Sequence, residues 1–163
     1  MRPFLFACFC CIITAAASAA PATGVVHPAP DFTFMAESKT RTLRSLRGQA
    51  VILIIAESPK NKAFKKQLKN LAGIYQELAS KQVILVAALA SPEGPIPTNI
   101  PVVIASNGTG TAAAYGVQKG FQIAIIGRDG NLDYQTGNVL AAERVRDVVQ
   151  NSFDIQTSAR KGN

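Results

Sequence analysis

Two short, unbroken apolar runs constrain the fold of this chain more than any other feature. The segments 51–56 and 83–90 contain only apolar residues and no helix-breaking glycine or proline. Each is far shorter than the ~20 apolar residues that a membrane-spanning helix needs, and each has the length of a buried strand. A strand that is apolar on both faces must be covered on both faces. The runs therefore predict an α/β fold with helices on both sides of a sheet.

An amphipathic helix is expected between the two runs, over 58–80. Ser58 is suited to cap its first turn, and Pro59 suits the first helical position. Apolar residues then recur at spacings of three and four, as on the buried face of a helix. They are Phe64, Leu68, Leu71, Tyr75 and Leu78.

The remaining segments continue this alternation of strands and helices. Strands are expected over 31–34, 101–105, 121–127 and 132–135, with Asp129-Gly130 as the turn between the last two. Single helical turns or short helices are expected over 40–46 and 111–115. Asn138 is expected to cap the last helix.

The first 20 residues have the features of a secretory signal peptide. Arg2 supplies a positive charge, an apolar stretch follows, and Ala17-Ser18-Ala19 is a small-residue cleavage pattern. All three cysteines, Cys8, Cys10 and Cys11, lie in this segment. We therefore expect a secreted or periplasmic mature chain with no thiol and no integral membrane span. It would comprise a lead-in over 21–30, one domain over 31–155 and a disordered tail over 156–163.

The chain is basic, with a formal net charge of +7. Lysines concentrate in the expected helix, at positions 62, 65, 66 and 69, and Lys60 lies near its start. The spacing places these lysines on one side of the helix, opposite the apolar residues. Two interpretations remain open: a solvated polar face, or a site for an anionic ligand or envelope surface, helped by free N–H groups at the helix start.

Four segments resemble the redoxin branch of the thioredoxin-like superfamily, which contains peroxiredoxins and thiol-disulfide oxidoreductases. They are Pro28-Ala29-Pro30-Asp31-Phe32, Leu43-Arg44-Ser45-Leu46-Arg47-Gly48, Ala113-Ala114-Tyr115-Gly116-Val117 and Ile125-Ile126-Gly127-Arg128-Asp129-Gly130. The resemblance implies a thioredoxin-like three-layer sandwich with a mixed central sheet and helices on both faces. The chain also resembles an uncharacterised exported domain that is shared with sushi-repeat matrix proteins.

The departures from the redoxin pattern bear on function. Where the resemblance implies a cysteine motif at a helix start, this chain has Ser58, Pro59, Lys60 and Asn61. The position implied for a cis-proline falls at Phe121. Both halves of the redox site are thus replaced, and we assign no catalytic residue.

Other combinations of residues give only weak indications of a functional site. The Gly-rich segment 106–111 lacks the lysine of a phosphate-binding loop and is interpreted as a turn. His27 is the single histidine, so neither a transition-metal site nor a triad with Ser58 is expected. Glu57 and Asp129 could be brought together by the fold, but more simply lie at a helix end and in a turn. No stacked-aromatic pattern indicates nucleic acid.

Three functional hypotheses follow, none of which needs a cofactor. The first is a redox-inactive binding or accessory module with an unknown protein partner. The second is a redoxin-type oxidoreductase relative, peroxiredoxin-like, with non-thiol or residual activity. The third is attachment to an anionic envelope component through Lys60, Lys62, Lys65, Lys66 and Lys69.

Overall fold

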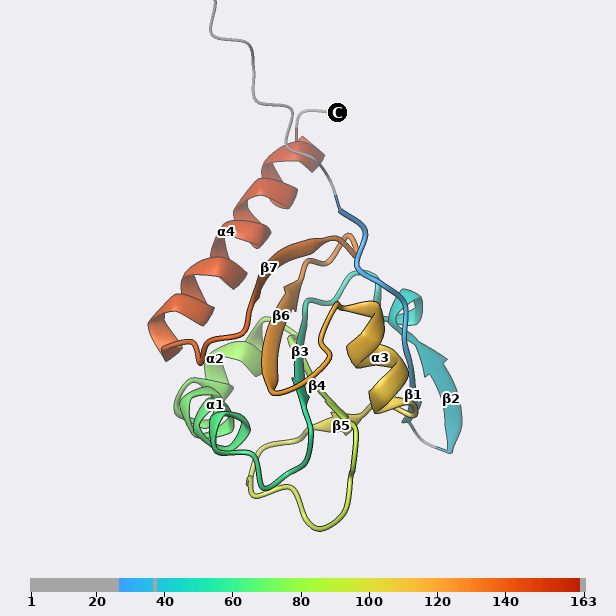
Figure 1. Cartoon of the computed structure of the whole chain (residues 1–163). Helices are drawn as coiled ribbons and strands as arrows, with labels where there is room; N and C mark the ends of the chain where they lie inside the picture. Colours follow the sequence, from blue (N-terminus) through green and yellow to red (C-terminus); the bar gives the residue numbers. More distant parts are fainter. Residues whose placement is uncertain (1–26, 37, 162–163) are drawn as a thin grey trace, which may run out of the picture.

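The computed structural model describes residues 27–36 and 38–161. Its main sheet has five strands in the spatial order β5-β4-β3-β6-β7 (Figure 1). The strands are β3 (Val51–Ala56), β4 (Ile84–Leu89), β5 (Val103–Ile104), β6 (Phe121–Ile126) and β7 (Leu132–Thr136). The three cysteines and the expected signal peptide lie outside the described residues.

Strand β3 is the centre of this sheet, and all six of its residues are buried. It pairs in parallel with β4 and antiparallel with β6. Strand β5 extends the sheet in parallel beside β4, and β7 extends it antiparallel beside β6. The sheet is therefore mixed, and the strands predicted from the two apolar runs are confirmed as its interior.

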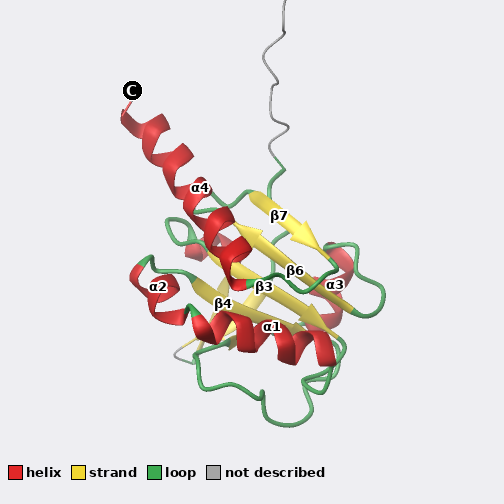
Figure 2. Ribbon diagram, turned by 90° about the vertical axis from the view of Figure 1, so that its left-hand side faces the viewer, coloured by secondary structure: helices red, strands yellow, loops and turns green. Residues whose placement is uncertain are grey.

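Helices cover both faces of the sheet (Figure 2). On one face lie α1 (Lys62–Gly73), α2 (Tyr75–Ser80) and α4 (Ala142–Lys161), and on the other lies α3 (Gly108–Ala114). This arrangement confirms the predicted α/β sandwich of three layers with a mixed central sheet.

The side chains of β3 divide the core into two parts, because successive residues of a strand point to opposite faces. Ile52 and Ile54 pack in the cluster that contains the apolar residues of α1, α2 and α4. Leu53 and Ile55 pack in the second cluster, with Phe34 and the other apolar residues near α3. Fully burying an aliphatic side chain of this size contributes ~1.5–3 kcal/mol.

A separate hairpin formed by β1 (Thr33–Ala36) and β2 (Lys39–Thr42) lies beside the edge strand β5. An isolated bridge joins Phe34 to Ala105. The helical turn predicted over 40–46 is only partly correct, because a 3-10 helix, η1, covers Leu43–Leu46 alone. Residues 39–42 pair with β1 instead, and this pairing satisfies their backbone groups.

Tyr115, the residue that ends α3, attaches the first described segment to this side of the sheet. Its buried hydroxyl donates to the carbonyl oxygen of Pro30 at 2.9 Å. Burial raises the pKa of Tyr115, and the nearby Asp31 carboxylate acts in the same direction. Two of the segments that resemble redoxins are thus joined by one hydrogen bond.

The helix predicted over 58–80 begins later and is interrupted. Asn61, not Ser58, is the N-cap, and its Oδ1 accepts from the N–H groups of Ala63 at 2.9 Å and Phe64 at 3.1 Å. The prediction of a Ser58 cap with Pro59 as the first helical residue is therefore wrong. The interruption follows Gly73, a poor helix former, where the next residue leaves the helical region with φ −120°.

The segment before α4 is held by α1 rather than by a cap. The prediction that Asn138 caps this helix is wrong, because α4 begins at Ala142. Gln67 accepts from the Leu140 N–H at 2.7 Å and donates to the Leu140 carbonyl oxygen at 3.3 Å. Asn70 donates to the same carbonyl oxygen at 2.8 Å.

Helix α4 extends further than the sequence predicted. Its backbone is helical through Lys161, so residues 156–161 form part of the helix where a disordered tail was expected. Once a helix is nucleated, each added residue contributes one more backbone hydrogen bond, which favours such an extension. Among the described residues, none of the helices combines the length and the apolar character needed to cross a bilayer.

The Gln67–Leu140 contact gives a first prediction. Gln67→Leu should lower the free energy of unfolding by about 1–3 kcal/mol, because the buried Leu140 N–H loses its acceptor. Urea denaturation measures this change. Gln76→Leu, at an exposed position of α2, is the control and should change stability by less than about 0.5 kcal/mol. Equal losses in the two variants would contradict the role assigned to Gln67.

Candidate functional site

The residues that replace the redox motif meet at the edge of the sheet where β3 ends. Ala56, the last residue of β3, is paired with Phe121 of β6 on one side and with Leu89 of β4 on the other. The segment 57–61, the loop after β4 and the loop before β6 therefore converge here. Phe121 and the start of the segment 58–61 thus lie at the same edge of the sheet.

Glu57 connects these three segments. Its backbone carbonyl oxygen accepts from the Ser91 N–H at 2.8 Å. Its carboxylate oxygen Oε1 accepts from the Gly120 N–H at 3.3 Å. Because Gly120 directly precedes Phe121, a carboxylate joins the two sides of the site.

The segment 58–61 forms a closed turn rather than an open helix start. The Asn61 N–H donates to the Ser58 carbonyl oxygen at 3.1 Å. Pro59 is buried, Ser58 is half-buried and Lys60 is exposed. The Asn61 cap occupies two N–H groups of the first turn. These two groups are thus not free for an external anion, so the helix start offers fewer donors than the anion-site hypothesis assumed.

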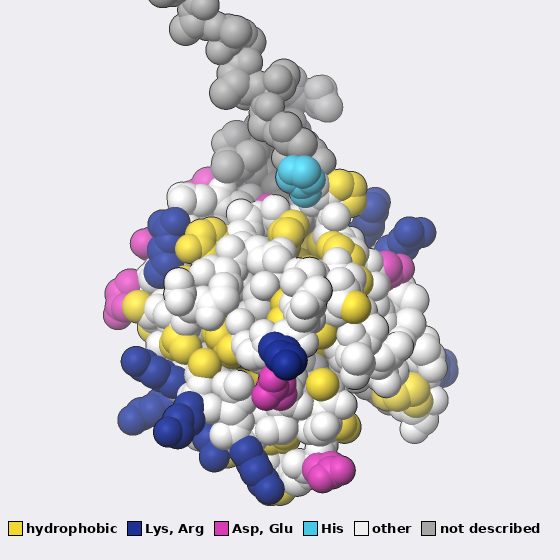
Figure 3. Space-filling model, viewed as in Figure 1, with side chains coloured by type: hydrophobic (Ala, Val, Ile, Leu, Met, Phe, Trp, Pro, Cys, Tyr) yellow, Lys and Arg dark blue, Asp and Glu magenta, His cyan; other side chains and the backbone are white. Residues whose placement is uncertain are grey.

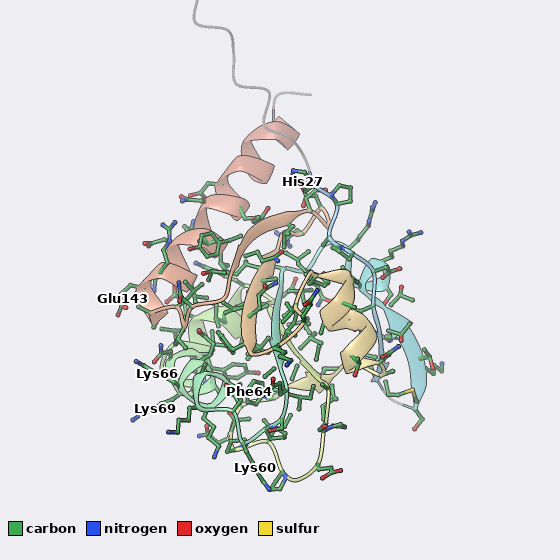
Figure 4. All side chains as sticks on the ribbon, in the orientation of Figure 1. His27, Lys60, Phe64, Lys66, Lys69 and Glu143 are labelled. Atoms are coloured by element: carbon green, nitrogen blue, oxygen red, sulfur yellow. The ribbon has the colours of Figure 1, made fainter. Side chains whose placement is uncertain are left out.

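Ser58 has no histidine near it. The backbone of His27 contacts Leu132, at the start of β7. Leu132 pairs with Ile126, whose partner in β3 is Val51, at the opposite end of the strand from Ser58. Figure 4 likewise places His27 far from Lys60. A triad of Ser58 and His27 is therefore excluded in this structure.

The loop before β6 has a backbone unlike the cis-proline turn that the resemblance implied. Among the described residues, every peptide bond is trans. Gly120 has a φ of +91°, a conformation that side chains disfavour. Phe121 follows it as the first residue of β6 and is half-buried. The loop at the position where the resemblance implies a cis-proline is thus a glycine turn, and the Glu57 carboxylate accepts a hydrogen bond from it.

A groove runs from this edge along α3, and we call it the β3-edge groove. Its near end is a small pocket of about 30 Å³ that includes Glu57, Lys119 and Gly120. Its far end is a hollow of about 400 Å³ beside Thr109 and Gly116. The two parts share Ala90, Ala112, Val117 and Gln118. A space of 30 Å³ holds about one water molecule, so a ligand would occupy mainly the far end.

Several groove residues were not predicted from the sequence, among them Ala90 and Ala112, whereas the loop before Phe121 was a candidate. A topological signal could have found them. Ala90 follows β4, which runs parallel to β3, and loops at the carboxyl ends of neighbouring parallel strands lie together. Val117 and Gln118 lie in the short connection between α3 and β6.

The five lysines lie on the exterior side of α1 and on the turn before it, and we call them the lysine face. Figure 3 shows Lys and Arg side chains gathered over this region, and Figure 4 labels Lys60, Lys66 and Lys69 there. Phe64, on the opposite side of the helix, is fully buried. Among the described residues, none of the lysine-face side chains forms an ion pair. The predicted division of α1 into an apolar and a basic side is confirmed.

The Gly-rich segment serves packing. Asn107 caps α3 by accepting from the Gly110 N–H at 2.8 Å. A Cβ at Gly108 would lie only 1.9 Å from the carbonyl oxygen of Leu89, so glycine is required at this position. Helix α3 can therefore approach β4 closely. The interpretation of 106–111 as a turn before a helix over 111–115 is only partly correct, because α3 already begins at Gly108 and ends at Ala114.

Two further combinations were considered in the sequence. Asp129 accepts from Asn131 in the turn after β6, at the opposite end of the sheet from Glu57. The fold therefore keeps these two carboxylates apart. Within residues 27–36 and 38–161, no group of three or more His, Cys, Asp or Glu side chains is arranged to hold a metal ion.

Comparisons with known proteins identify the fold. No family model and no curated protein sequence matches this chain. A structure from Chlorobium tepidum, described as a thiol:disulfide interchange protein DsbE, matches with a TM-score of 0.64 and 17% identity, over 78% of this chain and 96% of its own. The peroxidoxin BcpB from Mycobacterium tuberculosis matches with 0.58 and 14%, over 80% and 96%.

A third similar structure is the exposed lipoprotein thioredoxin Etrx1 from Streptococcus pneumoniae. It has a TM-score of 0.56 and 19% identity, over 75% of this chain and 99% of its own. These matches show that the chain has a thioredoxin-like fold of the form found in redoxins. The likeness to the exported domain shared with sushi-repeat proteins stays a prediction.

Proposed function

We propose that this chain is an exported thioredoxin-like domain that lacks thiol redox chemistry and acts as a binding or accessory module. One observation carries the proposal: Ser58 and Asn61 occupy the turn where the resemblance implies the redox cysteines, and no cysteine follows Cys11. In such a motif the reactive species is a thiolate, stabilised at a helix N-terminus. The chain retains the scaffold of that site without its nucleophile.

Ser58 is a poor substitute for a redox cysteine. Its hydroxyl is not appreciably ionised at neutral pH and cannot form a disulfide. A serine nucleophile needs an adjacent general base, and His27 lies at the other end of the sheet. Asn61 uses its side chain as a helix cap. These features support a site that binds rather than reacts.

The β3-edge groove supports the binding role. It begins at Glu57, directly before the turn at 58–61, and continues along α3, lined mainly by small and apolar side chains. A far end of about 400 Å³ is within the usual size of ligand pockets. A segment of an exported partner protein is therefore the ligand that we propose for this groove.

The redox part of the proposal predicts that the chain from Pro21 onward shows no turnover in insulin-reduction or peroxide-consumption assays. Its rate should equal that of a heat-killed sample, because neither assay can proceed through Ser58. Turnover above that background would instead favour the alternative, a redoxin-type oxidoreductase relative with non-thiol or residual activity.

The matched control introduces cysteines at positions 58 and 61, where the resemblance implies a cysteine motif. In a turn closed between residues i and i+3, the two Cα atoms lie within about 7 Å, which overlaps the disulfide range of about 4.4–6.8 Å. Ser58→Cys/Asn61→Cys should therefore raise insulin reduction on the order of tenfold above background. Loss of the Asn61 cap costs ~0.5–2 kcal/mol, so circular dichroism should confirm that this variant is folded.

Export is the second part of the proposal. The support is the charged, apolar and small-residue organisation of the first 20 residues, together with the description of one similar structure as an exposed lipoprotein thioredoxin. Intact-mass analysis of the exported form should give a chain that begins after Ala19 or Ala20. A mass that still includes Cys8, Cys10 and Cys11 would contradict both export processing and the absence of thiols.

The lysine face favours a second function, attachment to an anionic surface. Its five cations have no ion-pair partner among the described residues, and like charges at i,i+4 destabilise a helix slightly. An anionic surface would offset this repulsion. A lysine close to such a surface contributes about 1 kcal/mol, and salt weakens the attraction.

Charge reversal tests this second function. Changing Lys62, Lys65, Lys66 and Lys69 to Glu should reduce retention on phosphatidylglycerol vesicles by at least about tenfold. The control reverses four exposed basic residues elsewhere, so that the net charge is the same. They are Lys39, Arg47, Lys119 and Arg144. If both variants lose retention equally, the attraction depends on net charge and the lysine face is not a specific site.

A further inference from the structure

A second recess lies beside the lysine face, between α1 and residues 97–99. It has a volume of about 330 Å³. Leu68 and Ala72 line it from α1, together with the flanking Lys65 and Lys69. Leu68 is only 1% exposed and belongs to the main core, so this side of the recess is fixed by packing.

The opposite wall is also fixed. Ile96 packs against the main core and Ile100 is buried in it, so residues 97–99 are anchored at both ends. Within the wall, the Thr98 N–H donates to the Ile96 carbonyl oxygen at 2.8 Å. The Ile100 N–H donates to Thr98 Oγ1 at 3.3 Å. Pro97, in this wall, further restricts the backbone. The recess is therefore formed before any ligand arrives.

The chemistry of the lining defines the ligand. Lys65 and Lys69 supply two positive charges, and no acidic residue is among the described residues that line the recess. Because Thr98 Oγ1 accepts from Ile100, its hydroxyl hydrogen is available to donate. Ala72, half-buried, and Pro97, exposed, offer apolar surface. A ligand that fits must combine negative charge with an apolar group.

We propose that this recess binds a short acidic and apolar segment of a partner polypeptide. Carboxylates of the segment pair with Lys65 and Lys69, and an apolar side chain between them covers Ala72 and Pro97. A volume of about 330 Å³ accommodates side chains of a peptide. A flat anionic membrane would meet the exposed lysines but would gain little from an apolar recess. This inference rests on the proposed binding function and names a partner chemistry for the α1 side of the molecule.

The test is an NMR titration of the chain from Pro21 onward with the peptide acetyl-Gly-Asp-Leu-Glu-Gly-amide. Amide shifts should concentrate at Leu68, Ala72, Thr98 and Asn99. Replacing the peptide's Leu by Ser should weaken binding, because the apolar contact is lost. Shifts elsewhere, no shifts, or equal affinity for the two peptides would overturn the inference.

Two charge variants separate the recess from the lysine face as a whole. Lys65→Glu/Lys69→Glu should weaken peptide binding by about tenfold, since attraction becomes repulsion within the recess. Lys62→Glu/Lys66→Glu makes the same change of net charge on the same helix, but outside the recess, and should weaken it by less than about threefold. Unshifted amides of β3 would show that both variants are folded. Equal weakening would overturn the inference.

The remaining outcomes are also distinct. Binding to phosphatidylglycerol vesicles without any peptide shift would overturn the inference in favour of a membrane surface. Insulin reduction by the unmodified chain would refute the proposed redox inactivity and leave the peptide result unaffected. If the chain is redox-inactive and the peptide causes no amide shifts, only the proposed peptide binding in the recess would be refuted.

Discussion

The complete burial of β3 is the constraint on which the rest of the structure depends. A six-residue strand with both faces covered requires a layer of helices on each side and paired strands on both edges. The same pairing places Ala56 next to Phe121 and Leu89. The burial that stabilises the domain thus also assembles the candidate site, because the loops that continue these strands have to meet at one edge.

The parts of the fold that follow from the burial of apolar residues could be predicted from the sequence. The parts that depend on a choice between alternative caps or on strand pairing could not. Unbroken apolar runs identified β3 and β4. The predicted start of α1 was wrong because both Ser58 and Asn61 are residue types that favour the N-cap position. The turn closed between Ser58 and Asn61 places Asn61 in that position, and the sequence does not indicate this turn. Strand β2 was missed because its polar residues have no apolar alternation, and its pairing with β1 alone defines it.

Gln67 shows a different limit. It lies on the apolar side of α1, three residues after Phe64, where sequence patterns predict only core contacts. Its amide instead satisfies both backbone groups of Leu140, a residue 73 positions away. A polar residue on a buried helix face indicates that a backbone segment without regular structure packs there, but the pattern does not say which one. The contact between Glu57 and Gly120 could not be predicted either, because it joins two loop residues 63 positions apart.

The candidate site depends on contacts between loops. The Glu57 carboxylate joins the segment before the turn at 58–61 to the loop at 120–121, and the Asn61 amide caps α1. Two surfaces extend from this edge, the β3-edge groove along α3 and the lysine face along α1. Because β3 separates α1 from α3, a partner bound on one side leaves the other accessible. The two surfaces therefore lie over different parts of the core and are independent of one another.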